Sequence, residues 1–178
     1  PALLRARGGA RVVNLSSTAH TFTNTIDFST VRVDDIPKAP SGKSTYGSVS
    51  SYGRSKLANI LFTKELAKRF EGRGIVSYAV HPGAVNTNLG RHFNKLLLFF
   101  LAPLLTLLQK TPKQGAQTSL VCCLTPETKL ANGGYYFDCH VGSPSTAAQN
   151  AELAKDLWAF SVKNTEEFIR PDVRSLIA

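Results

Sequence analysis

The sequence has no methionine and few cysteines, and both shortages limit the classes of protein it could belong to. Its three cysteines, Cys122, Cys123 and Cys139, are odd in number and lack the paired spacing of a zinc site or a redox motif. This usage favours a reducing, intracellular compartment. Because the chain opens at Pro1 and contains no methionine, we expect it to be an incomplete copy of a longer protein.

Acidic residues are also scarce: 12 Asp plus Glu stand against 21 Lys plus Arg, and the formal net charge is +9. Such an excess of positive charge favours binding to nucleic acid, to an anionic membrane surface or to a phosphorylated ligand. The basic residues form no run of five or more and do not alternate with aromatic residues. We therefore expect no nucleic-acid binding.

Membrane spans, hydrolase motifs and metal-ligand spacings are absent as well. The most apolar stretch, residues 96–108, has 13 residues, whereas a bilayer span needs about 20. No Gly-x-Ser-x-Gly motif occurs, which argues against a serine hydrolase of that architecture. The histidines have no metal-ligand spacing, so we assign all four to capping or surface positions. They are His20, His81, His92 and His140.

What the sequence does contain is enough for one α/β domain over residues 1–178, with 43% hydrophobic residues. Residues 11–17 are predicted to form a short buried strand, and residues 75–80 a second one. Between them, residues 50–70 carry apolar side chains at the four-residue spacing of one helix face. A strand, a helix and a strand in that order predict a right-handed parallel crossover, and hence an open α/β sheet.

Further elements are predicted in the second half of the chain. A helix opens at Pro112, because proline is favoured in a first turn, and continues to Leu124. We place Cys122 and Cys123, which lie on it, in the core. Residues 135–137 are predicted to form a last short strand, and residues 147–169 a terminal amphipathic helix.

One pair of residues suggests acid–base chemistry. Tyr52 and Lys56 are four residues apart on the predicted helix, so they lie one turn apart on the same face. An adjacent cation favours the phenolate form of a tyrosine, which suits a general acid or base. A surface tyrosine beside a solvated lysine would show the same spacing, and both interpretations stay open on this pair alone.

The ends of the two predicted strands add candidate binding groups. Ser16 and Ser17 follow the first strand, at the edge where open α/β sheets bind ligands, and a hydroxyl there can bind a substrate carbonyl. The same serines could instead satisfy backbone groups at the strand exit. After the second strand, Pro82 and Gly83 could shape a loop that closes on a flat ring.

Taken together, these motifs resemble the short-chain dehydrogenases/reductases. The order is Asn14-Leu15-Ser16-Ser17, then Tyr52-x-x-x-Lys56, then Pro82-Gly83-x-Val85-x-Thr87. Four further stretches, residues 55–62, 80–83, 110–118 and 137–139, are similar to the retinol-dehydrogenase branch. The resemblance covers about residues 1 to 160 and implies a Rossmann-like, doubly wound parallel sheet that lacks its N-terminal half.

The resemblance also implies a role for each matching residue. Tyr52 would give or take the proton of the substrate oxygen, and Lys56 would support it and hold the nicotinamide ribose. Ser17, in preference to Ser16, would orient and polarise the carbonyl. The nicotinamide end of the cofactor would contact the loop after the second strand. Those cofactor-binding residues are Pro82, Gly83, Val85 and Thr87, together with Tyr52 and Lys56.

The expected activity is hydride transfer between a nicotinamide cofactor and a lipophilic alcohol or carbonyl of retinoid, steroid or fatty-aldehyde type. We expect NADP(H) rather than NAD(H), although the Gly-rich turn and the residue that selects between them would lie upstream of Pro1. The interval between Ser17 and Tyr52 is longer than usual for the family, which indicates an insertion at residues 31–48. Two alternatives are a relative that uses Tyr52 and Lys56 for epimerisation or dehydration, and an inactive fold that acts as a binding or regulatory protein.

Residues 91–112 are expected to form a lipophilic, substrate-binding segment. Thr106 is the only polar residue within residues 96–108, so an element there would need apolar partners on every side. An ordinary buried helix is the other interpretation. The basic residues that flank the stretch suit anionic head groups. We therefore expect a cytoplasmic protein or one associated with an intracellular membrane such as the endoplasmic reticulum, with membrane-surface association and homo-oligomer formation both allowed.

Overall fold

The computed structural model describes residues 9–31, 48–85 and 109–169, together with residues 3 and 6. Within them a four-stranded sheet has the order β1-β2-β3-β4. The strands are β1 (Ala10–Leu15), β2 (Ile75–His81), β3 (Tyr135–Phe137) and β4 (His140–Gly142). The first three strands run parallel and β4 runs antiparallel to β3, so the open, mainly parallel α/β sheet expected from the sequence is confirmed.

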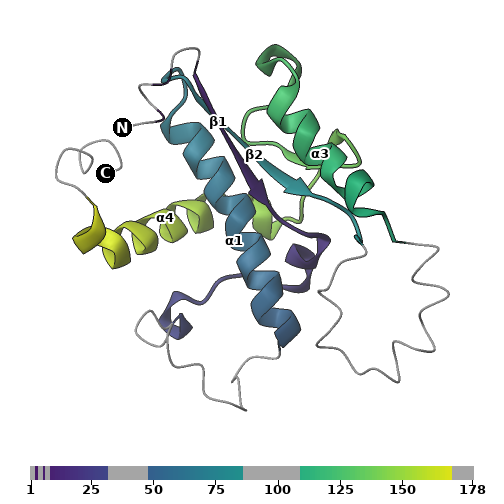
Figure 1. Cartoon of the computed structure of the whole chain (residues 1–178). Coiled ribbons are helices and arrows are strands. Elements are labelled where there is room, and N and C mark those ends of the chain that lie inside the picture. The colour runs from purple at the N-terminus through teal and green to yellow at the C-terminus, as the bar shows by residue number, and fades with distance from the viewer. Residues whose placement is uncertain (1–2, 4–5, 7–8, 32–47, 86–108, 170–178) are drawn as a thin grey trace, which may run out of the picture.

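Among the described residues, α-helices cover both faces of the sheet (Figure 1). They are α1 (Ser48–Arg69), α3 (Pro112–Leu124) and α4 (Ala151–Thr165). Short 3₁₀ turns lie between the larger elements: η2 (Thr18–Phe22), η3 (Phe28–Thr30), η5 (Glu127–Lys129), η6 (Ala147–Gln149) and η7 (Glu166–Phe168). The helix predicted for residues 50–70 therefore begins two residues earlier and ends one residue earlier than expected.

Alternation along β2 builds a separate core on each face. Ala79 packs with Leu57 and Leu61 of α1, in a cluster that α4 also joins. Its neighbours Tyr78 and Val80 pack on the other face, with Cys122 of α3. Because successive side chains of a strand point to opposite faces, β2 is buried on both sides and reads as a nearly continuous apolar run.

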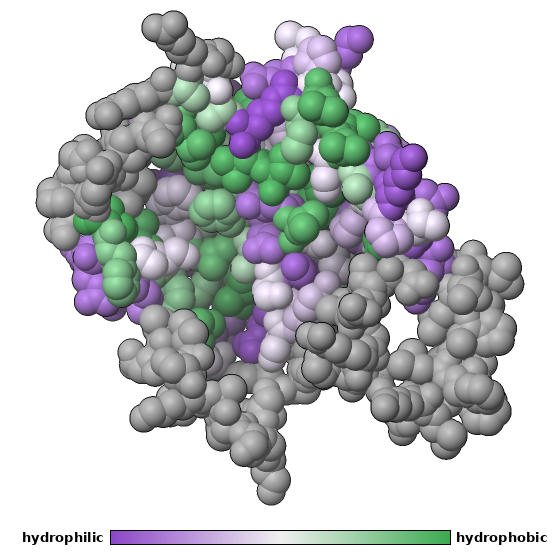
Figure 2. Space-filling model, in the orientation of Figure 1, coloured by the Kyte–Doolittle hydropathy of each residue, from purple (hydrophilic) through white to green (hydrophobic). Residues whose placement is uncertain are grey.

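The helix α3 buries small residues against the sheet and exposes two leucines. Its buried residues are small, Gly115, Thr118 and Cys122, whereas Leu120 and Leu124 are exposed. Apolar residues gather over this helix at the upper right of Figure 2. At its C-terminal end, Arg11 of β1 donates from Nη1 to the carbonyls of Cys122 at 3.1 Å and Thr125 at 2.5 Å. A cation there satisfies carbonyls that have no helical partner and complements the helix dipole.

The terminal helix differs from its prediction. Instead of one helix over residues 147–169, the structure has η6, then α4, then η7. The break occurs because the Asn150 side chain caps a new helix, accepting from the backbone N–H groups of Glu152 at 3.0 Å and Leu153 at 3.1 Å. Asparagine is a preferred N-cap residue, so a start signal was present inside the predicted helix. Residues 32–47, which include most of the predicted insertion, lie outside the described residues.

A close approach at Gly53 positions the second turn of α1 against η2. A Cβ atom at Gly53 would lie 2.7 Å from the carbonyl oxygen of Ala19, well inside normal contact distance. This oxygen belongs to backbone and has little freedom to move aside. The glycine between Tyr52 and Arg54 therefore lets the helix lie directly beside the turn that follows Ser17.

We predict that Gly53→Ala destabilises the protein, although alanine favours a helix by about 1 kcal/mol. Forcing the two backbones apart costs about 1–3 kcal/mol, so the free energy of unfolding should fall by about 1 kcal/mol. Urea unfolding measures this change. Lys68→Ala, at an exposed position of the same helix, should stay within about 0.5 kcal/mol of the parent. A Gly53→Ala protein more stable than the parent would show that the close approach does not exist.

Candidate active site

A cavity of about 490 Å³ lies where β1 and β2 end and α1 and α3 begin. Its lining includes residues from all four elements or from the loops that follow them. Among them are Ser17, Tyr52, His81, Pro82, Gly83 and Val85. Five of the residues expected at the site thus share one cavity at the carboxyl edge of the sheet, the usual ligand position in open α/β proteins.

The two serines after β1 have different partners. Ser16 is buried, and its hydroxyl donates to the backbone carbonyl of Lys56 at 2.8 Å. Ser17 is half-buried, and its Oγ accepts from the backbone N–H of Ala19 at 3.2 Å. Accepting a bond leaves the Ser17 hydroxyl hydrogen available for a carbonyl in the cavity. This difference supports the choice of Ser17 over Ser16.

Tyr52 and Lys56 lie next to each other on α1, as their spacing predicts. The Lys56 ammonium is 5.4 Å from the centroid of the Tyr52 ring, and its Nζ donates to the carbonyl oxygen of Leu15 at 3.3 Å. Asn59 donates to the same oxygen at 2.8 Å. The ammonium is therefore held at the end of β1, against the face of the tyrosine ring, while the side chain of Tyr52 stays 38% exposed at the cavity.

The loop after β2 is shaped by two glycines. Gly83 has a φ of +90°, a left-handed conformation that favours glycine. Gly115 of α3 accommodates Val85, since a Cβ there would lie 2.4 Å from Val85 Cγ2. Together these glycines place Pro82, Gly83 and Val85 along the cavity. Thr87, the remaining predicted cofactor contact, lies outside the described residues, as do residues 91–108 of the predicted substrate segment.

His81, predicted from the sequence to lie at a capping or surface position, lines the cavity. Its Nδ1 is buried and has no hydrogen-bond partner within the described part of the chain. Burial lowers the pKa of His81, and the nearby Lys110 ammonium lowers it further. One sequence feature could have indicated this position: His81 directly precedes Pro82, at the end of a buried strand.

His20 is also buried, and its two ring nitrogens define its tautomer. Its Nε2 accepts from the backbone N–H of Ser145 at 3.0 Å, so Nδ1 carries the hydrogen and donates to the carbonyl of Ser17 at 2.6 Å. His20 therefore has a capping role, as expected, but in the interior. It ties the turn that holds Ser17 to the segment before α4.

The two adjacent cysteines of α3 lie in different environments. Cys122 is fully buried, as predicted, and burial raises the pKa of its thiol to about 11. Cys123 was also placed in the core, but the helix turns its side chain outward, where it is exposed and lines the cavity. Consecutive helix residues point about 100° apart, so both could not face the sheet.

Comparison with known proteins agrees with this geometry. The sequence pattern of the short chain dehydrogenase family matches residues 39–96. Human Retinol dehydrogenase 11 is 40% identical over 158 residues, and mouse Retinol dehydrogenase 12 is 42% identical over 158 residues. Each alignment covers 89% of this chain and 46% of the relative. The chain thus spans about half the length of the curated relatives it matches.

Relatives also occur outside animals. Short-chain dehydrogenase TIC 32 A, chloroplastic, from Brassica napus is 39% identical over 88% of this chain and 47% of its own length. The crystal structure of an uncharacterized protein from Mycobacterium Paratuberculosis superposes with a TM-score of 0.50 and 26% identity, covering 89% of this chain and 51% of that one.

The fold and the comparisons agree: residues 39–96 match the short chain dehydrogenase family, and the chain is similar to retinol dehydrogenases over 89% of its length, as the sequence motifs predicted. In the part of the chain that the structure describes, no helix is both long and apolar enough to cross a membrane.

We predict that the His81 imidazole titrates below its ordinary value of about 6.5, because burial and Lys110 both oppose its charged form. The unfolded chain would then bind a proton at higher pH than the folded chain. Stability contributed by neutral His81 is therefore present above about pH 6.5 and decreases as the pH falls below it. Histidine NMR titration measures the midpoint. The His81→Asn variant identifies the resonance, and His140→Asn, at an exposed position, is the control. A His81 midpoint above 6.5 would show that the ring is not in this environment.

Proposed function

We propose that this chain carries the proton-transfer half of an oxidoreductase that moves hydride between a nicotinamide cofactor and a lipophilic alcohol or carbonyl. The observation that supports it best is that Ser17, Tyr52 and the Pro82–Val85 loop line one cavity. Retinoids are the first substrates to test, because the animal relatives are named retinol dehydrogenases.

The residues present fit the nicotinamide end of a cofactor. Gly83 lines the cavity, and its left-handed backbone, which favours glycine, shapes the loop that a flat ring would contact. Val85 and Pro82 add apolar surface along the same wall. When bound, the cofactor would supply or accept the hydride. Lys56 would hold its ribose, with Tyr52 beside it and Pro82, Gly83, Val85 and Thr87 around the nicotinamide. The preference for NADP(H) over NAD(H) stays a prediction from the family resemblance.

The proton chemistry would belong to three side chains. In the reduction direction, Ser17 donates a hydrogen bond to the substrate carbonyl oxygen and so favours negative charge on it. Tyr52 then transfers its phenolic proton to that oxygen as the alcohol forms. The Lys56 ammonium, beside the ring at 5.4 Å from its centroid, stabilises the phenolate that remains. Alcohol oxidation runs through the same groups in reverse.

We predict that Tyr52→Phe, in a full-length protein that contains these residues, lowers kcat by about 10²–10⁴-fold, the usual contribution of a positioned acid or base. Cofactor affinity should change little, because the substitution removes only the phenolic hydroxyl. Absorbance of the reduced nicotinamide, with retinal as substrate, measures the rate. Ser55→Ala is a matched control on the same helix turn, since Ser55 Oγ donates only to the carbonyl of Tyr52 at 2.7 Å and does not line the cavity.

Three outcomes would redirect the proposal. A Tyr52→Phe protein that keeps more than about a tenth of the parent kcat would remove the proton-transfer role from Tyr52. Substrate conversion without net change of cofactor would favour epimerisation or dehydration by the same residues. A full-length protein that binds but never turns over would support the inactive binding fold.

The apolar stretch at residues 96–108 is proposed to contact the hydrophobic tail of the substrate or a lipid surface. We predict that replacing Leu97, Phe100 and Leu104 together with Ser raises KM for long-chain aldehydes far more than for short ones, because only a long chain loses apolar contact. Liposome sedimentation of the same protein should show weaker partitioning. Equal changes of KM for short and long substrates, with unchanged partitioning, would assign the stretch to ordinary core.

A further inference from the structure

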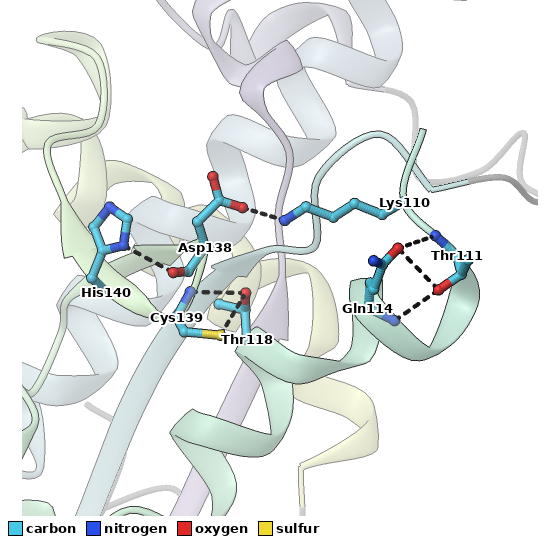
Figure 3. A network of polar contacts seen from close by, with 7 residues as sticks. All are labelled: Lys110, Thr111, Gln114, Thr118, Asp138, Cys139 and His140. Carbon is cyan, nitrogen blue, oxygen red and sulfur yellow. Dashed lines mark hydrogen bonds and ion pairs between the residues drawn. The ribbon is translucent and has the colours of Figure 1, made fainter. Parts of the chain in front are cut away.

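Lys110 connects three segments that are distant in the sequence. It lies two residues before the start of α3, its backbone meets the loop after β2, and its ammonium forms an ion pair with Asp138 in the turn between β3 and β4. Figure 3 shows the side chain extended from the start of α3 toward this turn. The hydroxyl of Thr111 and the side chain of Gln114 form a capping box directly behind it, which fixes the helix start.

On its backbone side, Lys110 meets the proposed cofactor loop. Its N–H donates to the carbonyl of Ala84 at 2.7 Å, and the residue forms a parallel bridge with Val85. The chain therefore leaves the site after Val85 and returns to the same place at Lys110. Val85 and Lys110 are therefore neighbours in the structure, although they are far apart in the sequence.

The side chain of Lys110 passes over Gly83. A Cβ at Gly83 would lie 2.9 Å from Lys110 Cδ and 3.1 Å from Nζ. The lysine stem thus lies directly on the left-handed glycine that gives the loop its shape. Any shift of the lysine changes the surroundings of Gly83.

The acceptor, Asp138, belongs to a rigid turn. Both residues of this turn, Asp138 and Cys139, have positive φ values, 47° and 68°. Such a conformation is unfavourable for residues other than glycine and persists only where neighbours support it. Here the N–H of Cys139 donates at 3.2 Å to the hydroxyl of Thr118, a buried residue of α3. The Asp138 carboxylate is therefore presented from a fixed backbone.

We propose that Lys110 and Asp138 are a positioning pair for the Pro82–Val85 loop, and that their ion pair holds this loop in the shape that receives the nicotinamide ring. The role deepens the proposed function and rests on it. Both side chains are partly exposed, 31% for Lys110 and 55% for Asp138. Ion pairs of this kind add at most about 1 kcal/mol to stability. The effect of the pair should therefore be local, on the loop that Lys110 touches, and small on the fold as a whole.

The experiment measures amide hydrogen exchange of Lys110, whose N–H is bound to Ala84, in the 178-residue chain without cofactor. The variants are Lys110→Met, Asp138→Asn and the double variant. Asparagine keeps the size of aspartate and tolerates positive φ, so this change removes the charge alone. Lys113→Met, in the exposed first turn of α3, is the matched control, and Lys110→Arg tests whether another cation restores the contact.

Exchange at residue 110 should be about two- to fivefold faster in each single variant, which corresponds to an exposed ion pair. The double variant should be no faster than either one, because both remove the same interaction. Lys110→Arg should return the rate toward the parent, and Lys113→Met should not change it. Unchanged exchange would overturn the proposal, and so would equal acceleration at Leu61 in the core of α1, which would indicate general destabilisation.

A second measurement separates this inference from the proposed function. In the full-length protein, the affinity for reduced cofactor, followed by nicotinamide fluorescence, should weaken about two- to fivefold in both single variants and stay constant in Lys113→Met. Faster exchange with unchanged affinity would overturn the positioning role. If the parent full-length protein binds no cofactor, the proposed function is wrong, whatever the role of Lys110 and Asp138. The hydrogen-exchange test still applies in that case, because unchanged exchange at residue 110 in the two variants would refute the positioning role.

Discussion

The parallel pairing of β1 with β2 determines where every group of the candidate site lies. Leu15 is in register with Val80, and the N–H of Ser16 donates to the Val80 carbonyl at 2.7 Å. Because parallel strands end at the same edge of a sheet, this register delivers Ser17 and Pro82 to one cavity. A shift of one residue would turn Ser16 and its neighbours to the opposite faces and would separate these groups.

The same strand end also fixes the position of α1. The carbonyl of Leu15 accepts from Lys56 and from Asn59, while the Ser16 hydroxyl donates to the carbonyl of Lys56. These bonds satisfy a backbone oxygen at the end of an edge strand, where no strand partner is available among the described residues. Lys56 therefore has a structural role in addition to its proposed catalytic one. Fold and chemistry depend on the same few contacts, so substitutions at Lys56 will affect both.

The residues that sequence reasoning missed are those whose partners are far away in the chain. His81 is next to Pro82 in the sequence, but its burial arises from packing between elements. Gly53 is required by the carbonyl of Ala19, and Lys110 pairs with Asp138, 28 residues later. No local sequence pattern predicts such contacts, because the spacing of residues within one element indicates only which residues of that same element are neighbours. The strand β4 was missed for a similar reason: three residues are too few for a periodicity, and its turn contains no glycine.

By itself, the sequence determined the α/β class, the parallel crossover, the positions of β1, α1 and β2 within one or two residues, and the resemblance to the short-chain dehydrogenases/reductases. These features follow from side-chain periodicity and from motifs that lie within single elements. Only the tertiary structure decided which serine keeps a free hydroxyl hydrogen, that the Lys56 ammonium lies against the Tyr52 ring, and that Cys123 faces the cavity while Cys122 faces the core. The physical reason is that hydrogen-bond partners and burial are set by distances between elements, and those distances come into existence only when the sheet, α1 and α3 pack together.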